Sequence, residues 1–374
     1  MHPVPSSQVS DTAKTYNRTK LTLGLLSSAL SFLLLAALVT GGRSSALTAL
    51  ARSVLPGEYG TLLVFGAAVA ALQAAITLPI AFTLGYLVEH RYGLSTQSLG
   101  LWARERLKAL LVGAPLAILL LIALYACLTY CGGLWWGALA LLVILTNVLA
   151  ARLAPVFVLR VFYTLTPIGE GTLRDRITLL CRSAGIPFQG LYSFDLSKNT
   201  RKANAAFAGI GKARRILLGD TLLREFTEEE IETIVAHELG HLRNHHIPIG
   251  IAVGALFTTA GLFASSRLYA WSLVELGFLG PTDIAALPLL AIWLSLFALV
   301  TTPLGNLLSR KHEWEADAFA VRATGNAKDF ASALRKLSAR NLADQDPHPL
   351  VEFLFYSHPS IGRRIRALKG AGTA

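Results

Sequence analysis

Long apolar runs separated by short polar connectors occupy most of the first 160 residues of this chain and return after residue 246. A helix needs about 20 apolar residues to cross the hydrocarbon core of a bilayer. Six stretches meet that requirement: residues 21–40, 61–88, 107–128, 134–159, 247–264 and 284–308. The pattern therefore predicts a predominantly α-helical, polytopic membrane protein with six transmembrane helices.

These runs divide the chain into five consecutive parts. A polar tail, whose first 13 residues are expected to be unstructured, precedes the membrane segments. Four spans, a soluble part, two further spans and a second soluble part follow. The expected boundaries are 1–20 for the tail, 21–160 for the four-span domain, 161–246 for the first soluble part, 247–308 for the last two spans and 309–374 for the C-terminal soluble part.

The first soluble part is expected to mix helices and strands. A helical pattern over residues 171–184 ends at Gly185 and Pro187. A second helix is expected to start at Thr227, because Thr227 and Glu230 fit the S/T-x-x-E capping box. Short strand patterns lie between the two helices, around residues 191–194, 205–208 and 215–218. The soluble part is thus expected to be α+β.

The composition supports a membrane as the main solvent. Charged residues make up 15% of the chain and hydrophobic ones 53%, with a mean hydropathy of +0.52, which is more apolar surface than a globular core needs. The net charge of +11 would point to nucleic acid in a soluble protein. Here the basic residues lie beside apolar runs, where they set orientation, so no nucleic-acid partner is expected. Three cysteines are too few and too poorly spaced for a disulfide framework or a cysteine zinc site.

The distribution of Lys and Arg between the connectors predicts the orientation of the spans. Basic residues accumulate on the side of the membrane that is not translocated. Seven lie on one side and three on the other: Lys14, Arg18, Lys20, Arg91, Arg104, Arg106 and Lys108 against Arg43, Arg52 and Arg267. Both termini and both soluble parts are therefore expected in the cytoplasm. The compact size and the richness in Ala, Leu and Arg are typical of a bacterial protein, which predicts the bacterial inner membrane.

The segment His237-Glu238-Leu239-Gly240-His241 is the strongest candidate for chemistry. Histidines four residues apart on a helix project from one face and can bind one metal ion. Zn²⁺ lowers the pKa of a coordinated water towards neutrality, and Glu238, beside the first ligand, can remove its proton. Two surface histidines on a polar helix are the plainer alternative. The capped helix start and the apolar stripe of Ile231, Ile234 and Val235 disfavour it.

A catalytic zinc site needs a third protein ligand and one open position. The metzincin pattern is excluded, because Asn244 and Ile247 stand where it requires Gly and His. Glu313 shares a helix face with Asp317, so Glu313 could bind the ion while Asp317 accepts a hydrogen bond from a ligand imidazole. Glu315 is expected to point away from that face. An acidic pair at this spacing is also common on solvated surfaces, and the residues alone leave both interpretations open.

These motifs, in this order, resemble the CAAX prenyl protease 1 family of integral-membrane zinc metallopeptidases. The similar segments are His237 to His241, Ser309-Arg310 with Glu313-x-x-x-Asp317, residues 166–171, residues 204–209 and 215–223, and Ser357-His358-Pro359 with Arg364. The resemblance covers roughly residues 82–368. It implies that Glu313 is the third ligand of a gluzincin-like site. It also implies a helical barrel around a large water-filled chamber that the zinc site closes at one end.

The resemblance further implies roles for residues outside the HExxH helix. Asn204 would lie on an edge strand to which an extended substrate adds as a further strand. His358 would stabilise the oxyanion or hold the substrate, and Arg364 would bind a carboxylate near the site or brace it. A loop histidine and a surface arginine are the plainer alternatives. His245 and His246 extend the histidine run and are expected to be solvated or to lie behind the ligands.

The leading hypothesis is a membrane endopeptidase with one Zn²⁺ per chain, in which Glu238 is the general base and then the proton donor to the leaving amine. The expected partners are membrane lipid and a membrane-associated peptide or protein substrate, including C-terminally prenylated (CAAX-type) ones. A quality-control protease similar to HtpX is the alternative, although such proteins usually have one hairpin of spans before the motif. A zinc-stabilised transporter or scaffold is a lesser alternative, because the predicted spans contain almost no charge.

Overall fold

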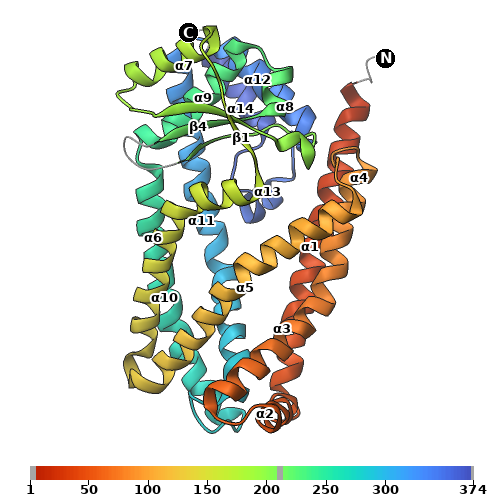
Figure 1. Ribbon diagram of the computed structural model, residues 1–374, viewed down its shortest axis with the longest axis vertical. Helices are drawn as coiled ribbons and strands as arrows, with labels where there is room; N and C mark the ends of the chain where they lie inside the picture. The colour runs from red at the N-terminus through yellow and green to blue at the C-terminus, as the bar shows by residue number, and fades with distance from the viewer. Residues whose placement is uncertain (1–5, 209–213, 372–374) are drawn as a thin grey trace.

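The computed structural model describes residues 6–208 and 214–371, and it shows a long helical body beneath a smaller α+β part (Figure 1). Among the described residues, six helices are long and apolar enough to cross a membrane, which confirms the predicted fold class. They are α1 (Ser6–Val39), α3 (Glu58–Phe82), α5 (Leu99–Tyr130), α6 (Trp135–Phe162), α10 (His246–Glu275) and α11 (Leu287–Thr324). A π-helical segment, η1 (Thr83–Val88), connects α3 to the short α4 (Glu89–Arg91).

The membrane helices lie in two groups that α5 joins. α6 packs against α10 along one side of the body, and α1 packs against α3 along the other (Figure 1). α5 runs obliquely between the two groups and contacts both α3 and α6. α11 contacts α1 and α10 and continues into the soluble part. α11 thus runs without interruption from the membrane body to the region around Glu313. The water-filled chamber stays a prediction.

Two segments are helical where the sequence suggested otherwise. α1 begins at Ser6, so the expectation of an unstructured tail is wrong for residues 6–13, and residues 1–5 lie outside the described part. Tyr16 is buried, and Asn17 Nδ2 donates to the carbonyl of Leu342 at 2.7 Å. The connector after α1 forms a further helix, α2 (Arg43–Val54), whose Ser44 hydroxyl donates to a carbonyl just before α11. Both helices depend on contacts with distant residues, which a local pattern does not reveal.

A four-stranded sheet with the order β1-β2-β4-β3 lies in the soluble part. β2 (Gly190–Phe194) and β4 (Arg215–Gly219) are parallel, and β1 (Leu165–Pro167) and β3 (Ala205–Ala208) pair antiparallel at the two edges. The three predicted strands are confirmed, and β1 is an additional one. β1 is three residues long and ends in a proline, which is tolerated at an edge but conceals the strand pattern in the sequence.

Helix α9 (Glu228–Arg243) lies in the middle of the soluble part. Its residues Ile231, Val235 and Leu239 are buried, and they share one apolar cluster with Leu218 and Phe330. α9 contacts α7, α11 and α12, so its position is determined from several sides. The remaining helices are α7 (Thr172–Ser183), α8 (Asp220–Glu225), α12 (Ala327–Asn341), α13 (Pro349–Phe355) and α14 (Ile361–Ala371), with short 3₁₀ segments η2 (Gly132–Leu134), η3 (Leu196–Lys198) and η5 (Ile284–Ala286).

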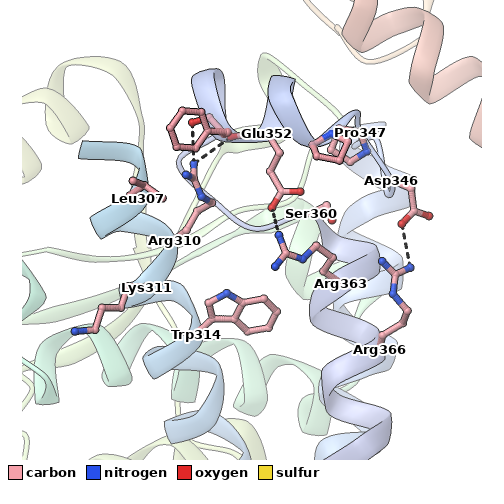
Figure 2. Close-up of a pocket in the computed structure, with 12 residues that line it drawn as sticks. Leu307, Arg310, Lys311, Trp314, Asp346, Pro347, Glu352, Ser360, Arg363 and Arg366 are labelled. Atoms are coloured by element: carbon pink, nitrogen blue, oxygen red, sulfur yellow. Dashed lines mark hydrogen bonds and ion pairs between the residues drawn. The ribbon is translucent and has the colours of Figure 1, made fainter. Parts of the chain in front are cut away.

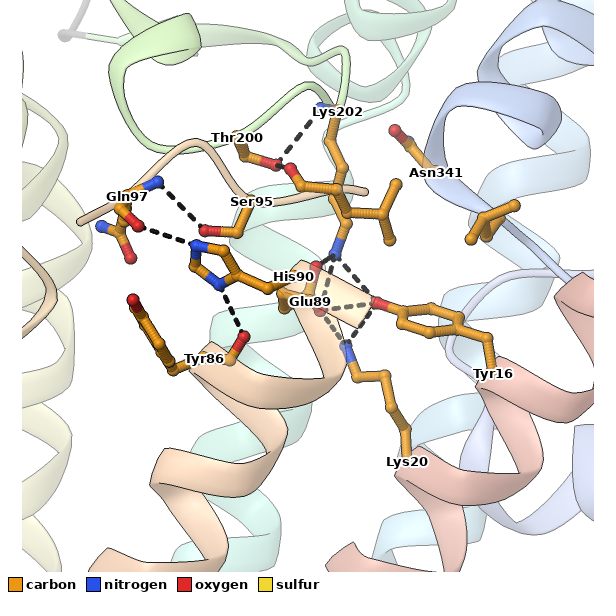
Figure 3. Close-up of polar contacts among 12 residues, drawn as sticks. Tyr16, Lys20, Tyr86, Glu89, His90, Ser95, Gln97, Thr200, Lys202 and Asn341 are labelled. Atoms are coloured by element: carbon orange, nitrogen blue, oxygen red, sulfur yellow. Dashed lines mark hydrogen bonds and ion pairs between the residues drawn. The ribbon is translucent and has the colours of Figure 1, made fainter. Parts of the chain in front are cut away.

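A polar cluster joins the soluble part to the membrane helices. Figure 3 shows Tyr16, Lys20 and Lys202 converging on Glu89. The hydroxyl of Tyr16 donates to Glu89 Oε1 at 2.6 Å, and Lys202 Nζ lies 2.8 Å from Glu89 Oε2. Burial lowers the pKa of Lys202, and the contact with Glu89 opposes that shift only in part. The loop that precedes β3 and carries Asn204 is therefore tied to α1 and α4.

Candidate metal centre and active site

α9 presents His237 and His241 to α11 because the two helices approach very closely. The capping box that begins α9 is formed, with Thr227 and Glu230 each accepting a hydrogen bond from the other's backbone N–H. Where α9 meets α11, a Cβ added to Gly240 would lie 2.8 Å from the Cα of Ala316. A side chain at position 240 would push the helices apart, so glycine is required here for the histidines to reach the carboxylates of α11.

Three potential ligand atoms converge at this contact. His237 Nε2 lies 3.4 Å from Glu313 Oε2, and His241 Nε2 lies 3.3 Å from Glu313 Oε1. One atom from each of the three residues lies within 4.8 Å of the others. Glu313 Oε2 is buried and has no hydrogen-bond partner among the described residues. Two imidazole nitrogens and a buried carboxylate oxygen form a donor set that suits Zn²⁺ with an open fourth position.

Asp317 and Arg364 hold His237 from behind. His237 Nδ1 lies 2.8 Å from Asp317 Oδ1, and the Arg364 guanidinium donates to both oxygens of Asp317 at 2.6 and 2.8 Å. Arg364 is 7% exposed, which contradicts the surface-arginine alternative and favours a bracing role. Burial lowers the pKa of His237, but the hydrogen bonds to Asp317 and Glu313 outweigh it and raise the pKa to about 9. With Nδ1 bound to a carboxylate, Nε2 of His237 is left to face Glu313.

Glu238 lies on α9, directly after His237 in the sequence. It is half-buried, and burial raises the pKa of its carboxyl although the neighbouring His237 and His241 oppose the shift. A carboxyl with a raised pKa is a stronger base, and a general base works best when its pKa lies close to the working pH. The position of Glu238 therefore suits proton transfer at this site.

Contacts around α13 hold the segment that carries His358. A cavity of about 710 Å³ lies beside α13, and Arg310 and Arg363 are among the residues that line it (Figure 2). Arg310 Nη1 donates to the carbonyls of Glu352 and Tyr356 at 3.0 and 2.6 Å, at the C-terminal end of α13. Arg363 pairs with the carboxylate of Glu352 at 2.9 Å. The segment between α13 and α14 is thereby attached to α11.

His358 reaches the cluster from this segment. Its Nδ1 lies 3.0 Å from Glu313 Oε1, while its side chain is 64% exposed. A second cavity, of about 350 Å³, opens beside it and is also lined by Asn17, Asp344 and Tyr356. Contact with Glu313 together with access to solvent favours a residue that meets the substrate over an isolated loop histidine.

The structure places Asn204 immediately before the edge strand β3. Its side chain is exposed, and its carbonyl accepts a hydrogen bond from the N–H of Gly219 at 2.9 Å. Within the described ranges, β3 pairs with β4 alone, and β3 also contacts α9. The family resemblance implies that the substrate adds to this edge strand, and the strand lies next to the HExxH helix.

Sequence reasoning missed one contact at the site. Glu315, which was expected only to lie off the face of Glu313 and Asp317, accepts a hydrogen bond from His246 Nε2 at 2.9 Å. His246 is buried, whereas its neighbour His245 is exposed. The two partners lie 69 residues apart, so their spacing carried no signal. The histidine run after the HExxH motif was the only hint.

Comparison with known proteins gives a consistent result. The profile of peptidase family M48 matches residues 167–371, and a profile described as the N-terminal, five-helix membrane part of CAAX prenyl proteases matches residues 2–164. A CAAX prenyl protease 1 homolog of Arabidopsis thaliana is 31% identical, over 78% of this chain and 70% of the relative. The uncharacterized metalloprotease YhfN of Bacillus subtilis is 29% identical, over 95% and 84%. The crystal structure of S. mikatae Ste24p has the same fold, with a TM-score of 0.85 at 23% identity over 98% of this chain and 91% of that one.

Proposed function

The chain belongs to peptidase family M48 and is a multi-pass membrane metalloendopeptidase, and we propose that its metal is a single Zn²⁺ bound by His237, His241 and Glu313. The observation that carries this proposal is the convergence of the three side chains, each with a potential ligand atom within 4.8 Å of the others. Three ligands leave one position open, which favours catalysis over the structural zinc of a transporter or scaffold.

The residues around the proposed ion have different roles in the reaction. Bound Zn²⁺ would polarise a peptide carbonyl and acidify water. Glu238 accepts the proton of the attacking water and passes it to the leaving amine. His358, exposed at the edge of the cluster, donates a hydrogen bond to the substrate oxygen that gains negative charge. Asp317 and Arg364 keep the ring of His237 oriented.

We further propose that the substrate is a C-terminally lipidated peptide, bound as an extended strand along β3 at Asn204. The relatives named CAAX prenyl protease 1 support the lipid. The extended peptide is supported by the edge of β3 beside α9, which no other strand of the described residues covers. Cleavage of unprenylated, damaged membrane proteins, as in HtpX-like proteases, is the competing possibility.

Purified protein loaded with Zn²⁺ tests the catalytic assignment. We expect Glu238→Gln to cleave a quenched peptide about 10²–10⁴ times more slowly than the wild type, because the general base is lost, while holding the same amount of zinc. Glu229→Gln, on the same helix but outside the cluster, should cleave normally. Full activity of Glu238→Gln, or zinc binding that survives His237→Ala, would refute the assignment.

The same assay separates the substrate classes. A farnesylated peptide, the identical peptide without the lipid, and an unprenylated membrane protein are compared by kcat/KM. Preference for the farnesylated peptide supports the CAAX-type proposal, and preference for the membrane protein supports the HtpX-like one. Asn204→Ala should raise KM more than it lowers kcat if the edge strand holds the peptide.

We propose that both termini and the site face the cytoplasm of a bacterial inner membrane, on the basis of the Lys and Arg distribution. Alkaline phosphatase is active only outside the cytoplasm. We expect it to be inactive when fused after Ala374 and active when fused after Pro56, in the connector between α1 and α3. The opposite pair of results would reverse the orientation.

A further inference from the structure

The second metal-binding histidine has a partner of its own. His241 Nδ1 lies 3.0 Å from His246 Nδ1, and His246 Nε2 lies 2.9 Å from Glu315 Oε2. We propose that His246 and Glu315 are positioning residues that orient the imidazole of His241 and select the tautomer that binds the metal, an inference that rests on the metal site proposed above.

The turn between α9 and α10 places His246 beneath His241. α9 ends at Arg243, and His245 adopts a left-handed conformation with φ of 57° before α10 begins at His246. His245 connects α9 to α10, and the side chain of His246, only 5% exposed, lies against His241 near the end of α9. A polar ring buried at this point needs hydrogen-bond partners, and within the described ranges these are His241 and Glu315.

His312 restricts the ring of His246 further. The two imidazoles stack with their centres 4.0 Å apart and their planes 5° from parallel. His312 and Glu315 are three residues apart on α11 and therefore share a face, which differs from the face of Glu313. One face of α11 thus supplies the proposed ligand Glu313. A neighbouring face supplies His312 and Glu315, which hold His246, the partner of His241.

The hydrogen-bond pattern has one arrangement that is compatible with a bound ion. If His241 Nε2 faces the metal, Nδ1 carries the proton and donates it in a hydrogen bond to His246 Nδ1. His246 then carries its own proton on Nε2 and donates to the carboxylate of Glu315, which accepts only. The reverse tautomer of His246 would leave Glu315 without a donor and would place a proton on His241 Nε2, where the metal should bind.

The two ligand histidines are therefore supported by similar means. Asp317 contacts His237 directly, whereas Glu315 acts on His241 through one intervening imidazole. Such outer partners of ligand imidazoles set ring orientation and basicity, and their loss commonly weakens metal binding about 10–100-fold.

Zinc affinity of the purified full-length protein, measured by competition with a chromophoric chelator, tests this inference. We expect His246→Ala to weaken zinc binding about 10–100-fold, and Glu315→Ala to weaken it by less in the same direction. His246→Asn should restore much of the affinity, because its side-chain oxygen can take the place of the accepting Nδ1. The matched control is His245→Asn, which removes an exposed histidine one residue away and tolerates the left-handed conformation.

The absorption spectrum of the Co²⁺-substituted protein is the second readout, since it reports ligand geometry rather than stability. It should change in His246→Ala and return towards the wild type in His246→Asn. Wild-type zinc affinity and an unchanged spectrum in both His246→Ala and Glu315→Ala would overturn the inference. If His246→Ala does not fold, Glu315→Ala tests the inference, with His246→Asn as the folded variant at position 246. Wild-type zinc affinity and an unchanged spectrum in Glu315→Ala would then overturn it. Normal zinc binding by His241→Ala would instead show that the metal site itself is wrong.

Discussion

Burial changes what individual charged residues contribute to stability around the proposed metal centre. Arg364, Asp317 and Glu313 are 7%, 4% and 3% exposed, so one guanidinium faces two carboxylates away from water. A bound cation would add a second counter-charge beside these carboxylates, next to the Glu313 oxygen that makes no hydrogen bond among the described residues. Arg366, two residues further along α14, forms an ion pair with Asp346 at 3.0 Å, but both side chains are more than half exposed.

This contrast predicts unequal effects of two similar substitutions. Arg364→Leu should destabilise the metal-free protein by about 3–5 kcal/mol, because it leaves buried carboxylates without their counter-charge. Arg366→Leu should cost less than about 1 kcal/mol, because water already screens its pair. Denaturant unfolding of both variants in the same detergent measures the difference, and equal losses would contradict the buried-pair argument.

At the scale of elements, the start of α9 is held by more than its capping box. The Glu230 carboxylate accepts hydrogen bonds from Lys336 Nζ at 2.6 Å and from Ser332 Oγ at 2.8 Å, both on α12. Burial by itself would raise the pKa of Glu230, but the hydrogen bonds from Lys336, Thr227 and Ser332 outweigh it and lower the pKa below 4.5. The residue that caps the HExxH helix therefore also joins it to its neighbour.

A lowered pKa of a carboxyl in the folded state predicts a definite pH dependence of stability. The contribution of ionised Glu230 is fully present above the unfolded pKa of about 4.5 and is lost as the pH falls through the lower folded value. The melting temperature of Glu230→Gln should thus lie furthest below that of the wild type near about pH 7. The gap should narrow below about pH 4.5, and a gap that widens on acidification would contradict the assignment.

At the scale of the whole molecule, the cluster at Glu89 connects the membrane helices to the loop before β3. Lys20 and Lys202 both contact Glu89, and the N–H of Arg201 donates to the carbonyl of Leu94 at 2.8 Å. The loop that leads to the proposed peptide-binding edge is therefore positioned by α1 and α4. Movement of these helices would be transmitted to that edge.

Removing Glu89 should loosen this connection. In Glu89→Ala, Lys20 and Lys202 would face each other without a counter-charge, and Lys202 is partly withdrawn from water. We expect faster hydrogen exchange in residues 195–208 and unchanged exchange in α9. Arg91→Ala, an exposed charge at the same helix end, should leave both regions unchanged. Unchanged exchange in Glu89→Ala would show that the cluster does not hold the loop.

Much of the architecture and part of the site could be predicted from local patterns. Apolar runs of sufficient length predicted the six spans, and the Thr227–Glu230 box predicted where α9 begins. Helix α2, strand β1 and the helical residues 6–13 were not predicted. α2 and β1 make contacts with distant residues, such as the hydrogen bond from Ser44 to the carbonyl of Ala285 and the pairing of β1 with β2.

The sequence by itself determined that the chain crosses a membrane and that His237, Glu238 and His241 lie along one helix. Hydropathy and helical spacing depend only on neighbouring residues, so the sequence suffices for both. Only the tertiary structure decided which carboxylate meets each histidine, because those distances depend on how closely α9 packs against α11 at Gly240. The same packing, with the turn at His245, brings His246 and Glu315 together behind His241, and no local pattern encodes a contact between residues so far apart.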